Sequence, residues 1–205
     1  MRYKEIEKNK EINAYLTKGN ANLGQLGFTD HSQAHCVQVA HQAGKILKRF
    51  GYSEHEIELA KIAGYMHDIG NAINRTHHAE YGALLANELL KDTDMSLEDR
   101  ITVVSAIGNH DESTGSPVDV ISAALIIADK TDVRRSRVRQ KERSAFDIHD
   151  RVNYAVTDSK LKIAEDKSVI ALNLQIDENI CSMYDYFEIF LELSLIHISE
   201  PTRLR

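Results

Sequence analysis

The chain has 205 residues, of which 42% are hydrophobic and 27% are charged, a composition typical of a globular protein with one sizeable core. Its net charge of −6 argues against a general attraction to nucleic acid or anionic membranes, so long nucleic acid is not an expected partner. No run approaches the ~18 apolar residues of a membrane span. The charged N-terminus lacks an apolar signal core, and the cysteines Cys36 and Cys181 have no CxxC spacing, so we expect a cytoplasmic protein without a membrane partner.

Apolar residues recur at helical spacing through the first two thirds of the chain. The pattern predicts helices over residues 4–16, 30–50, 54–67, 76–90, 96–108 and 118–133, with a loop over 19–27. Capping patterns mark three of the helix starts: Asp30 with Gln33, Ser53 with Glu56, and Ser96 with Asp99. Leu84 and Ile101 are expected on buried faces, and the helix over 118–133 is apolar enough to be central.

The sequence period changes after about Asn153. Two strands, residues 161–164 and 169–176, are predicted to form a hairpin, and an amphipathic helix over 181–193 follows. Residues 194–205 break this pattern and resemble vector read-through, so we expect a non-native tail. The expected fold is mainly α, with a helical domain over 1–152 and a β-hairpin plus helix appendage over 153–193.

The adjacent residues His67 and Asp68 end a predicted apolar helix. Neighbours on a helix point about 100° apart, so the two can share one metal only where a helix end lets both turn into a cleft. A carboxylate at such a place can also bridge two ions. Alone, the pair is equally consistent with a helix C-terminus at which the dipole favours histidine.

Other candidate metal ligands occupy comparable places on separate predicted helices. His35 lies on the preceding helix, His78 opens the next one, and His110 ends the fourth. Asp129 lies deep in the most apolar helix, where a carboxylate is costly unless it is paired or binds a metal. A buried pair with Lys130 or an arginine is the alternative, but neighbours on a helix, such as Asp129 and Lys130, do not face each other. A metal site is therefore the favoured interpretation.

Between Gly27 and Asp150 the chain resembles the HD superfamily of metal-dependent phosphohydrolases. That family's motif is a histidine, an adjacent His-Asp pair and a distant aspartate, each on a separate helix of an all-α core. Four residues match it in order and spacing: His35, His67, Asp68 and Asp129. Two more match the subset of the family that holds two metal ions: His78 and His110. The resemblance implies that these six residues bind metal in an HD-domain helical bundle that hydrolyses phosphate esters.

Two neighbouring histidine patterns need separate interpretation. His31 and His35 are spaced as in a zincin, but Ser32 occupies the place of the glutamate base, so that motif fails. His31 is interpreted as a residue beside the ligands or the substrate, with a solvated first-turn histidine as the equal alternative. His77 could replace His78 as a ligand, although the residues after His78 match the family spacing. Three histidines have no place in the pattern and are expected on the surface: His41, His55 and His149.

Histidine and carboxylate ligands suit one or two Mn²⁺, Fe or Zn²⁺ ions, with Mg²⁺ less favoured. In the expected chemistry a metal ion activates water for hydrolysis, and Asp68 is the natural bridge between two ions. Asp111 or His31 is a candidate to orient or deprotonate that water. No serine or cysteine stands beside a base in a way that predicts a covalent nucleophile.

A basic run follows Asp129. On a continuing helix Lys130, Arg134 and Arg137 would share a face and could bind phosphate oxygens. A solvated basic face is the equal alternative. If these residues bind phosphate, the substrate is a nucleotide-like small molecule, as a phosphomonoester or phosphodiester.

Two other functions use the same ligands. The first is a nucleotide-binding sensor without turnover, which would signal through the hairpin and last helix as a homodimer. The second is a di-iron oxygenase, because related HD proteins use this ligand set for oxidation. The presence of all six ligands speaks against a sensor, since an inactive site need not keep them.

Overall fold

The structure is a computed structural model that describes residues 1–111, 113–140 and 142–196. It is mainly α, as the sequence predicts. The α-helices are α1 (Tyr3–Glu7), α2 (Lys10–Gln25), α3 (Gln33–Phe50), α4 (Glu54–Met66), α5 (His78–Leu90), α6 (Leu97–Gly108), α7 (Val120–Lys130), α8 (Ile148–Ala155) and α9 (Met183–Ile196). The short 3₁₀ helices are η1 (Ile69–Ala72), η2 (Arg135–Arg137) and η3 (Arg143–Ala145), and the strands are β1 (Val156–Ile163) and β2 (Ile170–Ile176).

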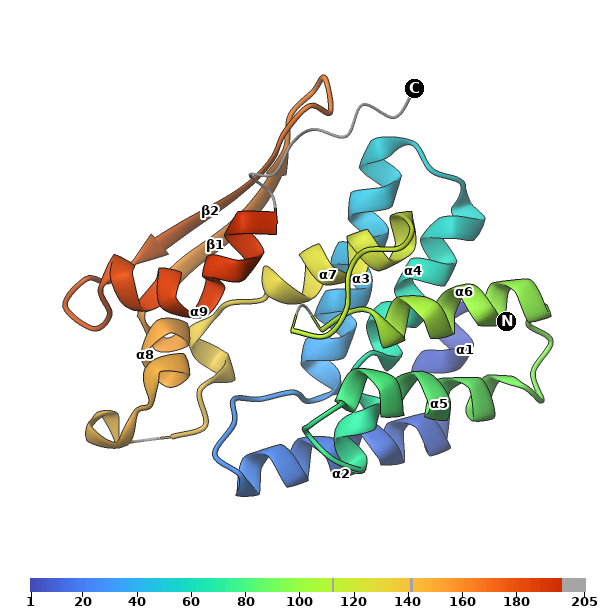
Figure 1. Cartoon of the computed structure of the whole chain (residues 1–205), viewed down its shortest axis with the longest axis horizontal. Helices are drawn as coiled ribbons and strands as arrows, with labels where there is room; N and C mark the ends of the chain where they lie inside the picture. Colours follow the sequence, from blue (N-terminus) through green and yellow to red (C-terminus); the bar gives the residue numbers. More distant parts are fainter. Residues whose placement is uncertain (112, 141, 197–205) are drawn as a thin grey trace.

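Helices α1 to α7 form the larger body of the molecule (Figure 1). α3 packs along α4 and α7, and α5 packs on α6 and η1. Their apolar stripes meet in one buried cluster that includes Val39, Ile62, Met66, Ile107 and Leu125. Burial of each such side chain is worth about 1.5–3 kcal/mol. The cluster therefore fixes how the ends of these helices lie relative to one another.

Two of the three predicted helix caps are formed. The side chains of Ser53 and Ser96 each accept a hydrogen bond from a first-turn N–H, of α4 and α6 respectively. The third prediction is wrong, because Asp30 lies before α3 and the N-cap of that helix is Ser32. The Asp30 carboxylate instead accepts hydrogen bonds from the hydroxyl and the N–H of Ser32, which fixes the turn that leads into α3.

The N-terminal region differs from the prediction. The helix predicted over 4–16 is two helices, because the Asn9 side chain accepts hydrogen bonds from two backbone N–H groups at the start of α2 and so begins a new helix. Most of the loop predicted over 19–27 is helical. The apolar stripe of α2 continues from Leu16 to Leu23, both of which are buried. Gly19 and Gly24 lie within α2, although glycine is a weak helix former.

Small residues form most of the buried face of α5, which ends at the buried Leu90. Gly82 is buried, whereas Leu84 is 69% exposed, and on α6 Ile101 is 57% exposed, so both apolar side chains were wrongly predicted to be buried. The small face lets α5 approach η1 so closely that a Cβ on Gly70 would stand 2.0 Å from the backbone oxygen of His78. The start of α5 is thereby held next to the end of α4.

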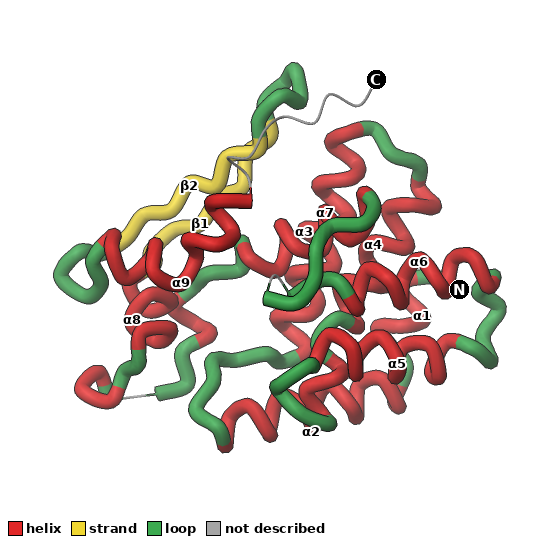
Figure 2. Tube along the Cα trace, viewed as in Figure 1, coloured by secondary structure: helices red, strands yellow, loops and turns green. Residues whose placement is uncertain are grey.

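The C-terminal segment consists of α8, the β1–β2 hairpin and α9 (Figure 2). The predicted hairpin is present, although β1 begins earlier, at Val156. A second, smaller buried cluster holds the segment together: Val133, Val152, Ala155, Val156 and Cys181. α9 begins later and ends later than predicted, and residues 197–205 of the expected tail lie outside the described residues. The domain division at 152/153 falls within α8 and stays a prediction.

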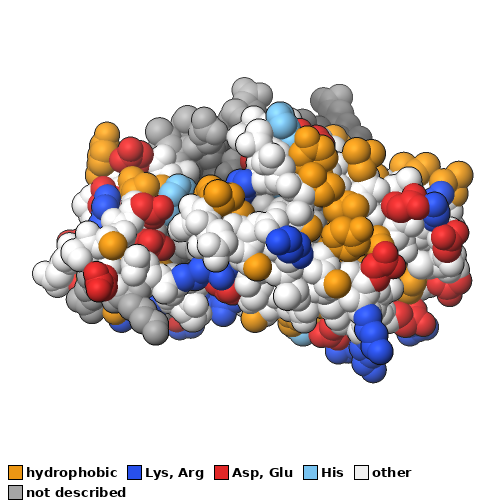
Figure 3. Space-filling view, turned by 90° about the horizontal axis from the view of Figure 1, so that it is seen from below, with side chains coloured by type: hydrophobic (Ala, Val, Ile, Leu, Met, Phe, Trp, Pro, Cys, Tyr) orange, Lys and Arg blue, Asp and Glu red, His pale blue; other side chains and the backbone are white. Residues whose placement is uncertain are grey.

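In the described part of the chain, no helix combines the length and the apolar character needed to cross a bilayer. Figure 3 shows a face on which basic and acidic side chains are mixed, with hydrophobic side chains between them. A face of this kind carries no extended basic field for a long polyanion.

Gly70→Ala tests the close approach of η1 and α5. The added methyl would overlap the His78 oxygen and stand 2.5 Å from the Gly82 nitrogen, and neither backbone atom can move without shifting α5. We expect the free energy of unfolding, measured by urea denaturation, to fall by about 3 kcal/mol or more. The control is Gly108→Ala, whose methyl meets only the Ala83 side chain, at 3.4 Å. Equal destabilisation by the two substitutions would contradict the close-approach argument.

Candidate metal centre

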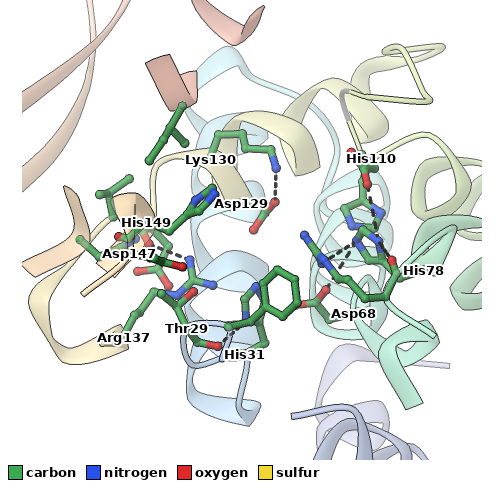
Figure 4. A pocket seen from close by; sticks show the side chains of 17 residues that line it. Thr29, His31, Asp68, His78, His110, Asp129, Lys130, Arg137, Asp147 and His149 are labelled. Carbon is green, nitrogen blue, oxygen red and sulfur yellow. Dashed lines mark hydrogen bonds and ion pairs between the residues drawn. The ribbon is translucent and has the colours of Figure 1, made fainter. Parts of the chain in front are cut away.

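A pocket of about 210 Å³ lies where the ends of several helices converge (Figure 4). The close-up shows Asp68, His78 and His110 on one side of it and Arg137 and His149 on the other. The pocket is therefore walled by acidic and imidazole groups from the helical body and by residues that follow α7.

The six predicted metal ligands all lie at helix ends, and four of them line this pocket: Asp68, His78, His110 and Asp129. They are His35 in the first turn of α3, His67 and Asp68 directly after α4, His78 at the start of α5, His110 just after α6, and Asp129 in the last turn of α7. Their side chains are at most 13% exposed. The fold thus brings together residues that are up to 94 positions apart (129 minus 35) in the sequence.

One group of potential ligand atoms comes from His35, His67 and Asp129, together with one oxygen of Asp68. The His35 Nε2 atom lies 3.2 Å from Asp129 Oδ1 and 3.7 Å from Asp68 Oδ2. The His67 Nε2 atom lies 3.3 Å from Asp68 Oδ2 and 3.6 Å from Asp129 Oδ1. Two imidazole nitrogens and two carboxylate oxygens therefore surround one point, as a metal ion requires.

A second group consists of Asp68, His78 and His110, whose ligand atoms all lie within 4.8 Å of one another. The His78 Nε2 atom is 3.9 Å from Asp68 Oδ1. The Oδ2 atom of Asp68 thus faces the first group, and its Oδ1 atom faces the second. The amide of Asn71 donates a hydrogen bond of 2.7 Å to Asp68 Oδ1 and holds this carboxylate in place.

The outer ring nitrogens of the four histidines all have acceptors. Nδ1 of His35 faces the Asp132 carboxylate at 2.7 Å, and the Nδ1 atoms of His67, His78 and His110 face backbone oxygens of Gly64, Arg75 and Ile107 at 2.9, 3.2 and 2.6 Å. An oxygen acceptor places the proton of a neutral ring on Nδ1. The lone pair then stays on Nε2, which is the arrangement that metal-ligating histidines adopt.

Two buried atoms at the centre, His35 Nε2 and Asp68 Oδ2, have no hydrogen-bond partner among the described residues. Leaving such atoms unpaired costs about 1–3 kcal/mol each. A cation shared by them would satisfy both. The residues therefore fit one or two divalent ions, and the four imidazoles with two carboxylates favour Mn²⁺, Fe or Zn²⁺ over Mg²⁺.

Neighbouring opposite charges shift the pKa values of Asp68, Asp129 and His67 more strongly than burial does. Burial alone would raise the pKa of Asp68 and Asp129, but His67 beside the first and Lys130 beside the second hold both carboxyl pKa values well below their usual range. Burial lowers the pKa of His67, yet the two carboxylates raise it to about 10. Burial also lowers the pKa of His110 to about 3, so that ring is neutral. In the absence of a metal ion His67 is therefore protonated beside two ionised carboxylates, and a bound cation would replace that proton.

Asp132 is a site residue that the sequence did not reveal. It is buried, its Oδ2 atom contacts His35 Nδ1, and its Oδ1 atom accepts a hydrogen bond of 2.7 Å from Arg134. A carboxylate behind a ligating imidazole orients the ring and makes it a stronger donor. The position three residues after Asp129 was a clue, but only the folded chain shows that Asp132 faces α3.

His31 lines the pocket, but it precedes α3, so the predicted helical face with His35 is not formed. Burial lowers the pKa of His31 to about 3, which keeps the ring neutral. Its Nδ1 atom lies 2.8 Å from the backbone oxygen of Thr29. The Nε2 lone pair is therefore the one that remains for a water or a substrate group.

Asp111 also lines the pocket, whereas His77 does not. One oxygen of Asp111 accepts hydrogen bonds from Ser113, and the other lies 3.5 Å from His78 Nδ1. The exposed His77 faces Glu80 instead. Of the two adjacent histidines, the structure thus places His78 in the centre.

The three basic residues predicted to bind phosphate do not share a helical face, because α7 ends at Lys130. Lys130 and Arg137 line the pocket, whereas Arg134 does not and pairs with Asp132. Arg137 donates to two backbone oxygens. Lys130 Nζ lies 3.2 Å from Asp129 Oδ2, so the adjacent pair that helix geometry disfavours forms at the helix end.

Nothing in the sequence indicated that three other residues line the pocket: Phe28, Arg75 and His149. Arg75, after η1, places Nη1 3.3 Å from His78 Nε2, and its guanidinium lies over the ring of Phe28. His149, expected on the surface without a role, lines the far wall from α8. Each belongs to a segment whose position depends on tertiary packing.

Comparison with known proteins identifies the family. A family model described as HD domain matches residues 33–137, which is just over half of the chain and includes all six candidate ligands. The chain therefore belongs to the HD domain family.

Several known proteins are similar to this chain. An uncharacterized protein from Methanocaldococcus jannaschii is 26% identical over 192 residues, covering 82% of this chain and 74% of the relative. Ribonuclease Y from Aster yellows witches'-broom phytoplasma is 33% identical over 126 residues, covering 58% of this chain but only 22% of that enzyme. A crystal structure of a predicted HD superfamily hydrolase from an uncultured Thermotogales bacterium aligns with a TM-score of 0.49 and 19% identity, over 92% of this chain and 91% of that one.

Asp132→Asn tests whether this carboxylate supports the metal ligand His35. The amide keeps the shape but loses the charge, so we expect metal affinity to fall by about 10- to 100-fold. The measurement is titration of chelator-treated protein with Mn²⁺ or Zn²⁺. Asp92→Asn, on an exposed loop, makes the same charge change away from the site. Unchanged affinity in a folded Asp132→Asn protein would show that His35 does not depend on Asp132.

Proposed function

We propose that the chain is a metal-dependent phosphohydrolase that cleaves a phosphomonoester or phosphodiester of a nucleotide-like small molecule. The observation that carries this proposal is the division of Asp68, with Oδ2 facing His35 and His67 and Oδ1 facing His78. A carboxylate shared in this way suits two ions held side by side. Two-metal sites of this kind serve phosphoester hydrolysis.

When bound, divalent ions supply water activation and neutralise charge on the phosphoryl oxygens. His35, His67, Asp129 and one oxygen of Asp68 would hold one ion. His78, His110 and the other oxygen of Asp68 would hold the second. Mn²⁺, Fe or Zn²⁺ suits these donors better than Mg²⁺.

Other residues of the pocket would act on substrate and water. Lys130 places an ammonium beside the ligand Asp129, where it can attract a phosphate oxygen. Neutral His31 can accept a hydrogen bond through Nε2 and so orient water. The Asp111 carboxylate lies beside Nδ1 of His78, the nitrogen that faces away from the centre. A role in positioning the His78 ring therefore suits Asp111 better than a role in proton transfer.

The volume of the pocket and the net charge of the chain support a small substrate. The pocket of about 210 Å³ is smaller than the ~300–1,000 Å³ typical of ligand sites, and the chain is acidic overall. The ribonuclease Y similarity makes an RNA phosphodiester the second candidate substrate. Because the match covers 22% of that enzyme, the activity of the whole ribonuclease is not carried over with it.

The proposed function is tested by phosphate or nucleotide release from mononucleotides, dinucleotides and short RNA, with Mn²⁺, Fe²⁺ or Mg²⁺ added. We expect release from at least one nucleotide, and a loss of more than ~100-fold in Asp68→Asn, because even residues behind metal ligands contribute 10- to 100-fold. Asp92→Asn is the matched control and should retain the full rate. Cleavage of RNA alone would favour the second candidate.

Two outcomes would contradict hydrolysis. Nucleotide binding without release under any metal would favour a sensor, and oxygen uptake by an iron-loaded, coloured protein would favour an oxygenase. Gel filtration with and without nucleotide would then test the expected homodimer.

A further inference from the structure

The rim of the pocket carries an aromatic ring and a guanidinium that the metal centre does not use. The Arg75 guanidinium carbon lies 5.4 Å from the centroid of the Phe28 ring, and both side chains line the pocket. Phe28 is 38% exposed, so its ring is accessible at the rim of the pocket. These two residues come from different segments, Phe28 from the turn after α2 and Arg75 from the segment after η1, and their side chains contact each other.

The backbone holds the Phe28 ring in a fixed place. α2 ends with Gly27 in the left-handed conformation (φ 86°), and the Phe28 N–H donates to the Leu23 oxygen while the Gly27 N–H donates to Gly24. This pair of bonds is the Schellman motif, which needs glycine at the left-handed position. The ring is thus presented to the pocket by a rigid turn rather than by a loose loop.

The Arg75 side chain lies next to His78 at the same rim. The backbone oxygen of Arg75 faces both the N–H and the Nδ1 atom of His78, which fixes the start of its side chain. Within the described residues, no carboxylate lies within ion-pair distance of its guanidinium; instead, Nη1 is 3.3 Å from His78 Nε2. A nitrogen lone pair that binds a metal ion cannot also accept from Arg75. Metal binding therefore frees a guanidinium next to the centre.

We propose that Arg75 and Phe28 form a recognition lip for the substrate, in which Arg75 binds the phosphate and Phe28 stacks on a planar base. This inference rests on the proposed phosphohydrolase function. A pocket of about 210 Å³ takes the phosphate end of a nucleotide, so the base lies at the rim, where the exposed ring is. Arginine binds phosphate through paired N–H donors, and an aromatic face stacks on any base. The substrate class is a mononucleotide or a nucleotide end, recognised by phosphate and ring rather than by base edges.

The test is calorimetric binding to the metal-loaded protein. The probes are inorganic phosphate, a phosphonate analogue of AMP whose carbon–phosphorus bond resists hydrolysis, and the same phosphonate without the base. We expect the parent protein to prefer the base-bearing phosphonate by about tenfold, a Phe28→Leu protein to lose this preference, and Phe28→Tyr to keep it. Binding of inorganic phosphate should be the same in all three.

Arg75→Ala is expected to weaken binding of all three probes by about tenfold or more, inorganic phosphate included. Its metal content, measured by elemental analysis, should equal that of the parent. Arg49→Ala removes the same charge from an exposed position on α3 and should change nothing. Loss of metal in Arg75→Ala would overturn the lip, because Arg75 would then act through His78.

Three further results would overturn the lip: no binding of the probes by the parent, no preference for the base, or a preference that survives Phe28→Leu. Phosphate release in the substrate screen separates this failure from failure of the proposed function. Release without a base preference leaves the hydrolase and removes the lip. A base preference lost in Phe28→Leu, without release from any substrate, supports the lip and removes the hydrolase.

Discussion

The burial of two carboxylates among four imidazoles is the constraint on which the helical body depends. Asp68 and Asp129 are charged groups in an interior that would otherwise favour their neutral forms. They are tolerated because histidine nitrogens and Lys130 face them, and a bound cation would compensate them further. Every helix from α3 to α7 supplies one end to this arrangement, so the packing of the core and the assembly of the centre are the same problem.

Helix ends suit this arrangement because their last backbone carbonyl groups are available to accept hydrogen bonds from side chains. The last carbonyls of α4 and α6 have no partner within their own helix, and the Gly64 and Ile107 oxygens meet the Nδ1 atoms of His67 and His110. The same contact satisfies the backbone and sets the tautomer of the ring. The close approach of η1 and α5 then brings His78 opposite Asp68.

The sequence predicted the mainly α fold through helical periodicity, which is a local signal. It predicted the six residues that converge through polar residues at helix ends together with the resemblance to the HD family. It failed where position depends on packing. Leu84 and Ile101 have the spacing of buried residues, but α5 buries Ala79, Gly82 and Ala86 instead, and α6 buries Val103, Ala106 and Ile107. Asp132 and Arg75 look like ordinary charged residues until α3 and α5 are placed beside them. The basic run lost its predicted common face because α7 stops at Lys130.

All six candidate ligands lie within residues 33–137, the region that matches the HD family model. Much of the pocket wall lies outside that region. Phe28 and His31 precede that region, and His149, Asn153 and Ile189 follow it. Exchange of these flanking segments during evolution would therefore alter what the pocket admits and leave the cation-binding set intact. Relatives that share the central region alone can be expected to keep the cation-binding residues and to differ in what the pocket admits.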